Sequence, residues 1–165
     1  MTVGEAIRAR RSIRKYQAGH VIPQEQLDAI LEAGMLAPSA MNLRPYEFVV
    51  LRDRGKFPGI IRIHPYARML ETASVCIVVC GFSGDGGSQW FQQDCGAVTE
   101  NMLLQALEFG LGTCWCGVYP VMDRVEGFKK LLGIDSTPFG LIALGLPDES
   151  PAMRGRYEAA KVRYV

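Results

Sequence analysis

The run from Ser74 to Phe82 constrains the fold most, because nearly all of its residues are apolar. A run of this length is far too short to cross a bilayer as a helix. It predicts a strand that is buried on both faces. The segment from Gln89 to Phe109 predicts a long helix with apolar residues on two faces, and such a helix is either deeply buried or part of a subunit interface. Helices are therefore expected to pack around a central buried strand.

The other elements are marked by caps, prolines and apolar periodicity. With 165 residues, 48% of them hydrophobic, the chain is expected to form one domain over residues 1–165 with a substantial core. The fold class predicted is α+β, with helices around a sheet of four or five strands. Helices are expected from the Thr2–Glu5 capping box to about Arg10, from Pro23 to before Pro38, and around Val121–Leu132; strands are expected at Tyr46–Leu51, Gly112–Tyr119 and Pro138–Leu146, and Val162–Val165 suits an added strand.

Positive charge is concentrated at the two ends of the chain. Residues 1–16 hold five basic and one acidic side chain, a balance of +4, and residues 153–165 hold four basic and one acidic, a balance of +3. The segment between them carries −6, so the net charge is only +1. A nucleic-acid-binding domain is usually basic as a whole. This distribution favours a small anionic ligand over a polyanion.

The two basic clusters together predict an anion site. Near the N-terminus three guanidinium groups and a hydroxyl fall within five residues, and the planar fork of arginine suits a phosphate. A duller interpretation is that cations near a helix C-terminus complement its dipole. The second cluster at the far end of the chain favours the anion site. The candidate residues are Arg10, Arg11, Ser12 and Arg14, together with Arg154 and Arg156.

Two further segments suggest contacts with a flat ligand. In the loop Pro38–Pro45, Ser39 and Asn42 could hydrogen-bond to a planar polar ring, although such residues usually serve the turn itself. In Cys114-Trp115-Cys116 the two cysteines face one side of the predicted strand and Trp115 the other. Burial of the cysteines as small apolar residues is favoured over a metal site, and no metal site is predicted.

Several common nucleotide-binding and catalytic motifs are absent from the sequence, and their absence is informative. The glycine patterns lack both dinucleotide-binding and P-loop spacing, and no GxSxG or HExxH motif occurs. A bound cofactor can carry hard chemistry with few catalytic side chains. The five cysteines have no CxxC spacing and no export signal precedes them, so reduced thiols and a cytoplasmic location are expected, without a membrane segment.

Taken together, these residues resemble the nitroreductase family of flavin enzymes, and specifically its compact members. The order and spacing of several short motifs carry the resemblance over essentially the whole chain. They are Ala6-Ile7 through Arg10-Arg11-Ser12-Ile13-Arg14, Leu27 to Asn42, Pro45-Tyr46-Glu47-Phe48, Pro65-Tyr66-Ala67, Thr99 to Leu104, Gly110-Leu-Gly112 and Leu141 to Gly145.

The resemblance implies a homodimer with FMN at the subunit interface, a mostly antiparallel sheet and an exchanged C-terminal tail. The N-terminal cluster would hold the FMN phosphate, its ribityl chain or the pyrimidine edge, and Arg154 and Arg156 would complete the phosphate site. Pro38, Ser39 and Asn42 would approach from the other subunit. The stretch Trp115-Cys116-Gly117 would lie along the ring. Arg44 stands where many members have Gln, and the helical insertion of larger relatives is missing.

Such a site implies that NAD(P)H reduces FMN and that a small acceptor, such as a nitroaromatic or a quinone, reoxidises it in a ping-pong cycle. The flavin would carry the chemistry, so no catalytic side chain is predicted. Three other hypotheses remain open at this point. They are a flavin carrier or sensor without turnover, a specialised member that fragments flavin or removes a substituent reductively, and an anion-binding module for phosphorylated ligands or RNA.

Overall fold

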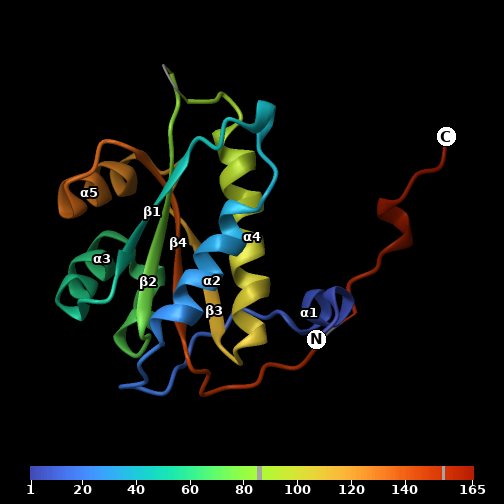
Figure 1. Cartoon of the computed structure of the whole chain (residues 1–165), viewed down its shortest axis with the longest axis horizontal. Coiled ribbons are helices and arrows are strands. Elements are labelled where there is room, and N and C mark those ends of the chain that lie inside the picture. The colour runs from blue at the N-terminus through green and yellow to red at the C-terminus, as the bar shows by residue number, and fades with distance from the viewer. Residues whose placement is uncertain (85–86, 154) are drawn as a thin grey trace.

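The computed structural model describes residues 1–84, 87–153 and 155–165, and it is built around an antiparallel sheet (Figure 1). In the described residues the sheet has four strands in the order β1-β2-β4-β3. Each neighbouring pair is antiparallel, which confirms the predicted sheet type. The strands are β1 (Tyr46–Leu51), β2 (Val75–Gly81), β3 (Gly112–Gly117) and β4 (Thr137–Gly145).

Helices cover both faces of this sheet, as the apolar run in β2 requires (Figure 1). Every residue of β2 is buried. On one face the core is formed with α2 (Gln24–Met35) and α4 (Phe91–Glu108). On the other face it is formed with α3 (Phe57–Ile63) and α5 (Met122–Leu132). The other predicted helices and strands are confirmed to within a few residues, whereas residues 162–165 form no strand within this chain, and α3 and the 3-10 turn Pro65–Glu71 were not predicted.

The long helix α4 confirms the prediction of two apolar faces. Phe91, Cys95, Val98 and Met102 are buried against the sheet and α2, and Leu103 is buried as well. Leu104 and Leu107 are only partly buried, because they lie on the side that the sheet does not cover. Among the described residues no helix is both long and apolar enough to span a membrane.

The segment after α1 (Val3–Ala9) is fastened to the edge of the sheet. The Thr2 capping box opens α1 as predicted, and the chain then runs extended beside β3, where the backbone N–H of Ile13 donates to the Thr113 carbonyl at 2.8 Å. The buried Tyr16 hydroxyl donates to the carbonyl of Ile13 at 2.7 Å and lies 3.1 Å from that of Ala143. These bonds fix the backbone that carries Ser12 and Arg14.

The same segment is tied to the start of the C-terminal tail. The backbone N–H of Gln17 donates to the Leu146 carbonyl at 2.9 Å, and that of Asp148 donates to the Lys15 carbonyl at 2.9 Å. The Glu149 carboxylate accepts from the backbone N–H groups of Arg14 and Lys15. Beyond this clamp the tail leaves the body of the molecule (Figure 1). Residues 162–165 are exposed, and their pairing with a second chain stays a prediction.

We expect Tyr16→Phe to destabilise the fold by about 1–2 kcal/mol, because it removes the buried hydroxyl from two backbone carbonyls. Chemical denaturation measures the loss. Tyr157→Phe is the matched control, since Tyr157 is 80% exposed. Equal stability of the two variants would show that the hydroxyl does not hold the N-terminal segment.

Candidate functional site

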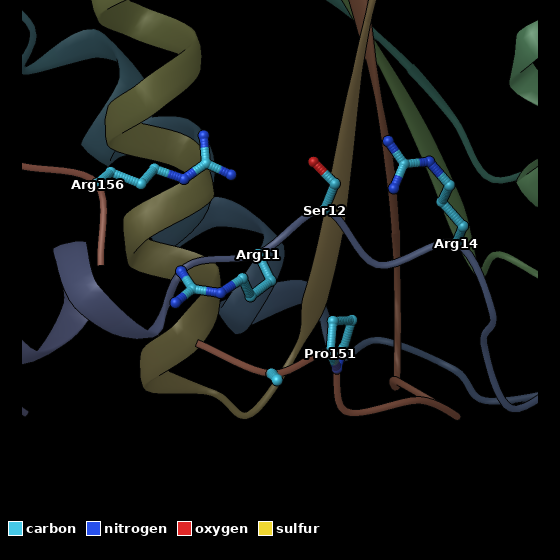
Figure 2. A pocket seen from close by; sticks show the side chains of 6 residues that line it. Arg11, Ser12, Arg14, Pro151 and Arg156 are labelled. Atoms are coloured by element: carbon cyan, nitrogen blue, oxygen red, sulfur yellow. The ribbon is translucent and has the colours of Figure 1, made fainter. Parts of the chain in front are cut away.

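The two ends of the chain meet in a pocket of about 340 Å³. Figure 2 shows Arg11 and Arg156 on one side of Ser12 and Arg14 on the other. The lining residues are Arg11, Ser12, Arg14, Pro151, Ala152 and Arg156. This lining offers three guanidinium groups and a hydroxyl and includes no carboxylate, so it suits an anion with several oxygens, such as a phosphate.

Local structure explains why these side chains point into one space. Ser12 pairs with Thr113 in a parallel bridge, and successive residues of an extended chain face opposite sides. Ile13 is buried in the core, so Ser12 and Arg14 face outward together. Arg156 reaches the pocket because the Glu149 clamp sets where the tail begins.

One predicted anion-site residue, Arg10, is placed differently. The Arg10 guanidinium forms an ion pair with Glu100 of α4, with 3.0 Å between Nε and Oε1. It lines an adjoining pocket of about 680 Å³ rather than the smaller one, although Arg11, Ser12 and Arg156 line both. A sequence separation of ninety residues hides this pairing from sequence analysis. Arg154 lies outside the described residues.

A second pocket, of about 630 Å³, adjoins the first because Arg14 lines both. It runs along the predicted Trp115-Cys116-Gly117 stretch at the end of β3. Its lining residues are Arg14, His64, Pro65, Tyr66, Arg68, Met69, Cys114, Trp115, Cys116, Gly117 and Arg124. The two pockets together could hold one elongated ligand that has an anionic group at one end and a flat body at the other.

The cysteines of β3 are buried as predicted. Cys114 and Cys116 face the core, whereas Trp115 is 38% exposed and its ring lies 5.7 Å from that of Phe139. The two thiols are neighbours and do not titrate alike. The Cys116 thiol, with help from Arg14, lowers the pKa of Cys114 against the opposing effect of burial. The pKa of Cys116 is raised by its neighbour and by burial.

His64 also lines the second pocket, although no sequence motif marks it. It is only 2% exposed, and its Nε2 lies 2.8 Å from the Gly117 carbonyl oxygen, so this nitrogen carries the proton. Its Nδ1 has no hydrogen-bond partner among the described residues. Burial and the Arg124 charge lower the pKa of His64, so the ring is neutral at pH 7. A lone histidine carries no motif, and only the fold brings it to β3.

The predicted loop residues Pro38, Ser39 and Asn42 lie far from the arginines of the same chain. Their loop is attached near the start of α4, where the Ala40 N–H donates to the buried Asp94 carboxylate at 2.9 Å (Figure 1). The Ser39 hydroxyl accepts from the Arg44 N–H at 3.0 Å and so stabilises the turn. Asn42 is exposed and has a φ of 55°, a left-handed conformation that asparagine tolerates well. Within one chain this loop does not reach the pocket of Figure 2.

We expect Cys114 to be the first cysteine alkylated in the native protein, because the neighbouring Cys116 thiol lowers its pKa and because it lines the second pocket. Burial raises the pKa of Cys80 and Cys95 to about 12. Brief treatment with iodoacetamide followed by peptide mass spectrometry identifies the labelled site. Cys114→Ser should remove the fast reaction, and Cys95→Ser should not. Fast labelling elsewhere would contradict the assignment.

Similarity to known proteins identifies the family of this chain. The model of the nitroreductase family matches residues 7–58 and 61–146. A protein of Methanothermobacter thermautotrophicus, provisionally named NADH dehydrogenase/NAD(P)H nitroreductase, is 44% identical over 98% of this chain and 86% of its own length. A crystal structure from Parabacteroides distasonis with the same provisional name has a TM-score of 0.92 and 34% identity, covering 97% of this chain and 95% of that one.

A third relative was solved with a ligand bound. It is a provisionally named nitroreductase from Desulfovibrio desulfuricans, solved in complex with FMN. It has a TM-score of 0.83 and 29% identity, and the match covers 100% of this chain and 97% of that one. The order of motifs, the antiparallel sheet and these matches agree, and this chain belongs to the nitroreductase family.

Proposed function

We propose that the chain is an FMN-dependent oxidoreductase that takes electrons from NAD(P)H and passes them to flat acceptors such as nitroaromatics and quinones. The observation that carries the proposal is the pair of pockets joined at Arg14. One end is cationic and suits a phosphate, and the other runs along β3 and suits a ring. The FMN complex of the D. desulfuricans relative and the NAD(P)H in the name of the M. thermautotrophicus relative support the cofactor and the electron donor.

The residues of the first pocket fit the phosphate of FMN. Arg11, Ser12 and Arg156 would bind its oxygens through charge-assisted hydrogen bonds. Arg14 lies between the pockets and would hold the ribityl chain or the pyrimidine edge. Arg10 would support these residues indirectly, because its charge is already paired with that of Glu100.

The residues of β3 would position the ring. When bound, FMN supplies the hydride and electron transfer that no side chain here provides. Trp115, Cys116 and Gly117 would lie along the ring, and the His64–Gly117 hydrogen bond holds the end of this strand in place. A donor and an acceptor that use the same face in turn would give a ping-pong cycle.

We further propose that two copies of this single domain share each site. The Pro38–Asn42 loop is attached to Asp94 near the start of α4, whereas Arg10 beside the arginine pocket pairs with Glu100, further along the helix. Two chains related by a two-fold axis could bring the loop of one to the arginines of the other. Exposed apolar side chains beside α4 support such an interface; they are Val3, Ile7, Met35 and Leu36. The exposed tail, with Tyr164 and Val165 at its end, would pack on the partner.

We expect Arg11→Ala and Arg156→Ala each to weaken FMN binding about ten- to a hundredfold, because each removes a charge-assisted contact of about 1.5–3 kcal/mol. Flavin fluorescence quenching measures the dissociation constant, and thermal melting of the FMN-free protein checks the fold. Arg62→Ala is the control, since Arg62 is exposed on α3 and lines neither pocket. Unchanged FMN affinity in both pocket variants would refute the phosphate assignment.

The purified protein should show a flavin absorption spectrum, and heating should release FMN. Under anaerobic conditions NADH or NADPH should bleach this spectrum, and a quinone should restore it over many turnovers. Sedimentation of the same sample should give the mass of a dimer. Failure to take up FMN would contradict the flavoenzyme. Slow reoxidation by every acceptor would indicate a carrier or sensor instead, and a monomer with bound FMN would contradict the shared site.

A further inference from the structure

The second pocket contains more positive charge than FMN binding accounts for. Its lining includes Arg14, Arg68 and Arg124 and no aspartate or glutamate. In the described part of the chain the ion pairs are Arg10–Glu100 and Lys161–Glu158, so neither Arg68 nor Arg124 has a carboxylate within ion-pairing distance there. The proposed function assigns a role to Arg14 alone. The charges of Arg68 and Arg124 remain without a partner.

Neutral groups hold Arg124 in the pocket wall. Its Nη1 lies 3.4 Å from the Gly117 carbonyl oxygen, and its guanidinium carbon lies 5.8 Å from the centre of the Tyr66 ring. A carbonyl and an aromatic face orient a guanidinium without cancelling its charge. Asp123 and Glu126 are near Arg124 in sequence, but neither lines the pocket. Arg124 is therefore oriented in advance for an anion.

The walls beside these arginines suit a flat ring. The Tyr66 ring, over which the Arg124 guanidinium lies, belongs to a residue that is 75% exposed. A planar acceptor would remove this surface from water. The neutral His64 adds no charge to this wall.

We propose that Arg68 and Arg124 form a subsite for the anionic group of an aromatic acceptor, such as a ring that carries a carboxylate or a sulfonate. This proposal rests on the proposed function, because it names the acceptor class of the same site. The phosphates of NAD(P)H present similar chemistry to an arginine pair. Reduction of the flavin by NAD(P)H and its reoxidation by the acceptor can be measured separately. The comparison shows whether the arginine pair binds the acceptor or the phosphates of NAD(P)H.

The test compares a charged and a neutral acceptor on the FMN-loaded protein. The acceptors are 1,4-naphthoquinone-2-sulfonate and 2-methyl-1,4-naphthoquinone, and the variants are Arg68→Gln and Arg124→Gln with Arg62→Gln as control. We expect each pocket variant to lower kcat/KM for the sulfonate about tenfold relative to the neutral quinone. Rapid mixing with NADH and NADPH should give unchanged rates of flavin reduction. Arg124→Lys, which keeps the charge but not the fork, should fall between wild type and Arg124→Gln.

A binding measurement separates this subsite from the flavin chemistry. Naphthalene-2-sulfonate cannot be reduced at the flavin, and its affinity can be measured by tryptophan fluorescence with or without FMN. We expect its dissociation constant to rise about tenfold in Arg68→Gln and Arg124→Gln and to stay unchanged in Arg62→Gln. This readout remains available even if the protein takes up no FMN, so the two proposals can fail separately.

Three results would overturn the subsite. An equal loss for both quinones would show that the arginines only support the structure. A loss confined to reduction by NADH or NADPH would assign them to the phosphates of the donor. Weaker FMN binding in both pocket variants would assign them to the cofactor. The Arg68 side chain makes no hydrogen bond or ion pair in the described structure, so a folding defect in Arg124→Gln would leave Arg68→Gln as a decisive test.

Discussion

The site depends on backbone hydrogen bonds that hold like charges together. Arg11, Arg14 and Arg156 repel one another, and nothing in their own chemistry would gather them around an empty space. Ile13 is bonded to Thr113, and the tail is bonded to the N-terminal segment through Glu149. These neutral or compensated contacts fix the chain on both sides of the pocket. An anion bound there relieves the repulsion. Because the folded chain already holds the arginines in place, they need no rearrangement to bind it.

The elements that were predicted are those whose signals are local. The strand at Tyr46–Leu51 was predicted with its observed bounds, because a proline precedes it and it is rich in aromatic and β-branched residues. The buried β2 and the long α4 follow from their apolar patterns. Helix α3 was missed because it is only seven residues long, and its few apolar residues fit a helix or a strand equally well.

The residues of the candidate site also differ in whether their signal is local in the sequence. Arg11, Ser12 and Arg14 form a dense cluster in the sequence, and the excess charge at the far end pointed to Arg156. His64 and Arg68 flank the Pro65-Tyr66-Ala67 motif without belonging to it, and Arg124 comes from a segment without a motif. Only the packing of α5 and of the Pro65–Glu71 turn against the sheet brings them beside β3. The pairing of Arg10 with Glu100 is likewise a property of the fold.

In the dimer proposed above, the separate placement of the loop and the arginines would link FMN binding to assembly. If FMN bridges Arg156 of one copy and Asn42 of another, each copy alone offers an incomplete site. A ligand that binds the paired form more tightly than the single chain must stabilise the pair by the same free energy. The exposed apolar residues beside α4 then need not form a strong interface on their own. In this arrangement the cofactor is also a structural element, and variants of the arginine pocket weaken association as well as FMN binding.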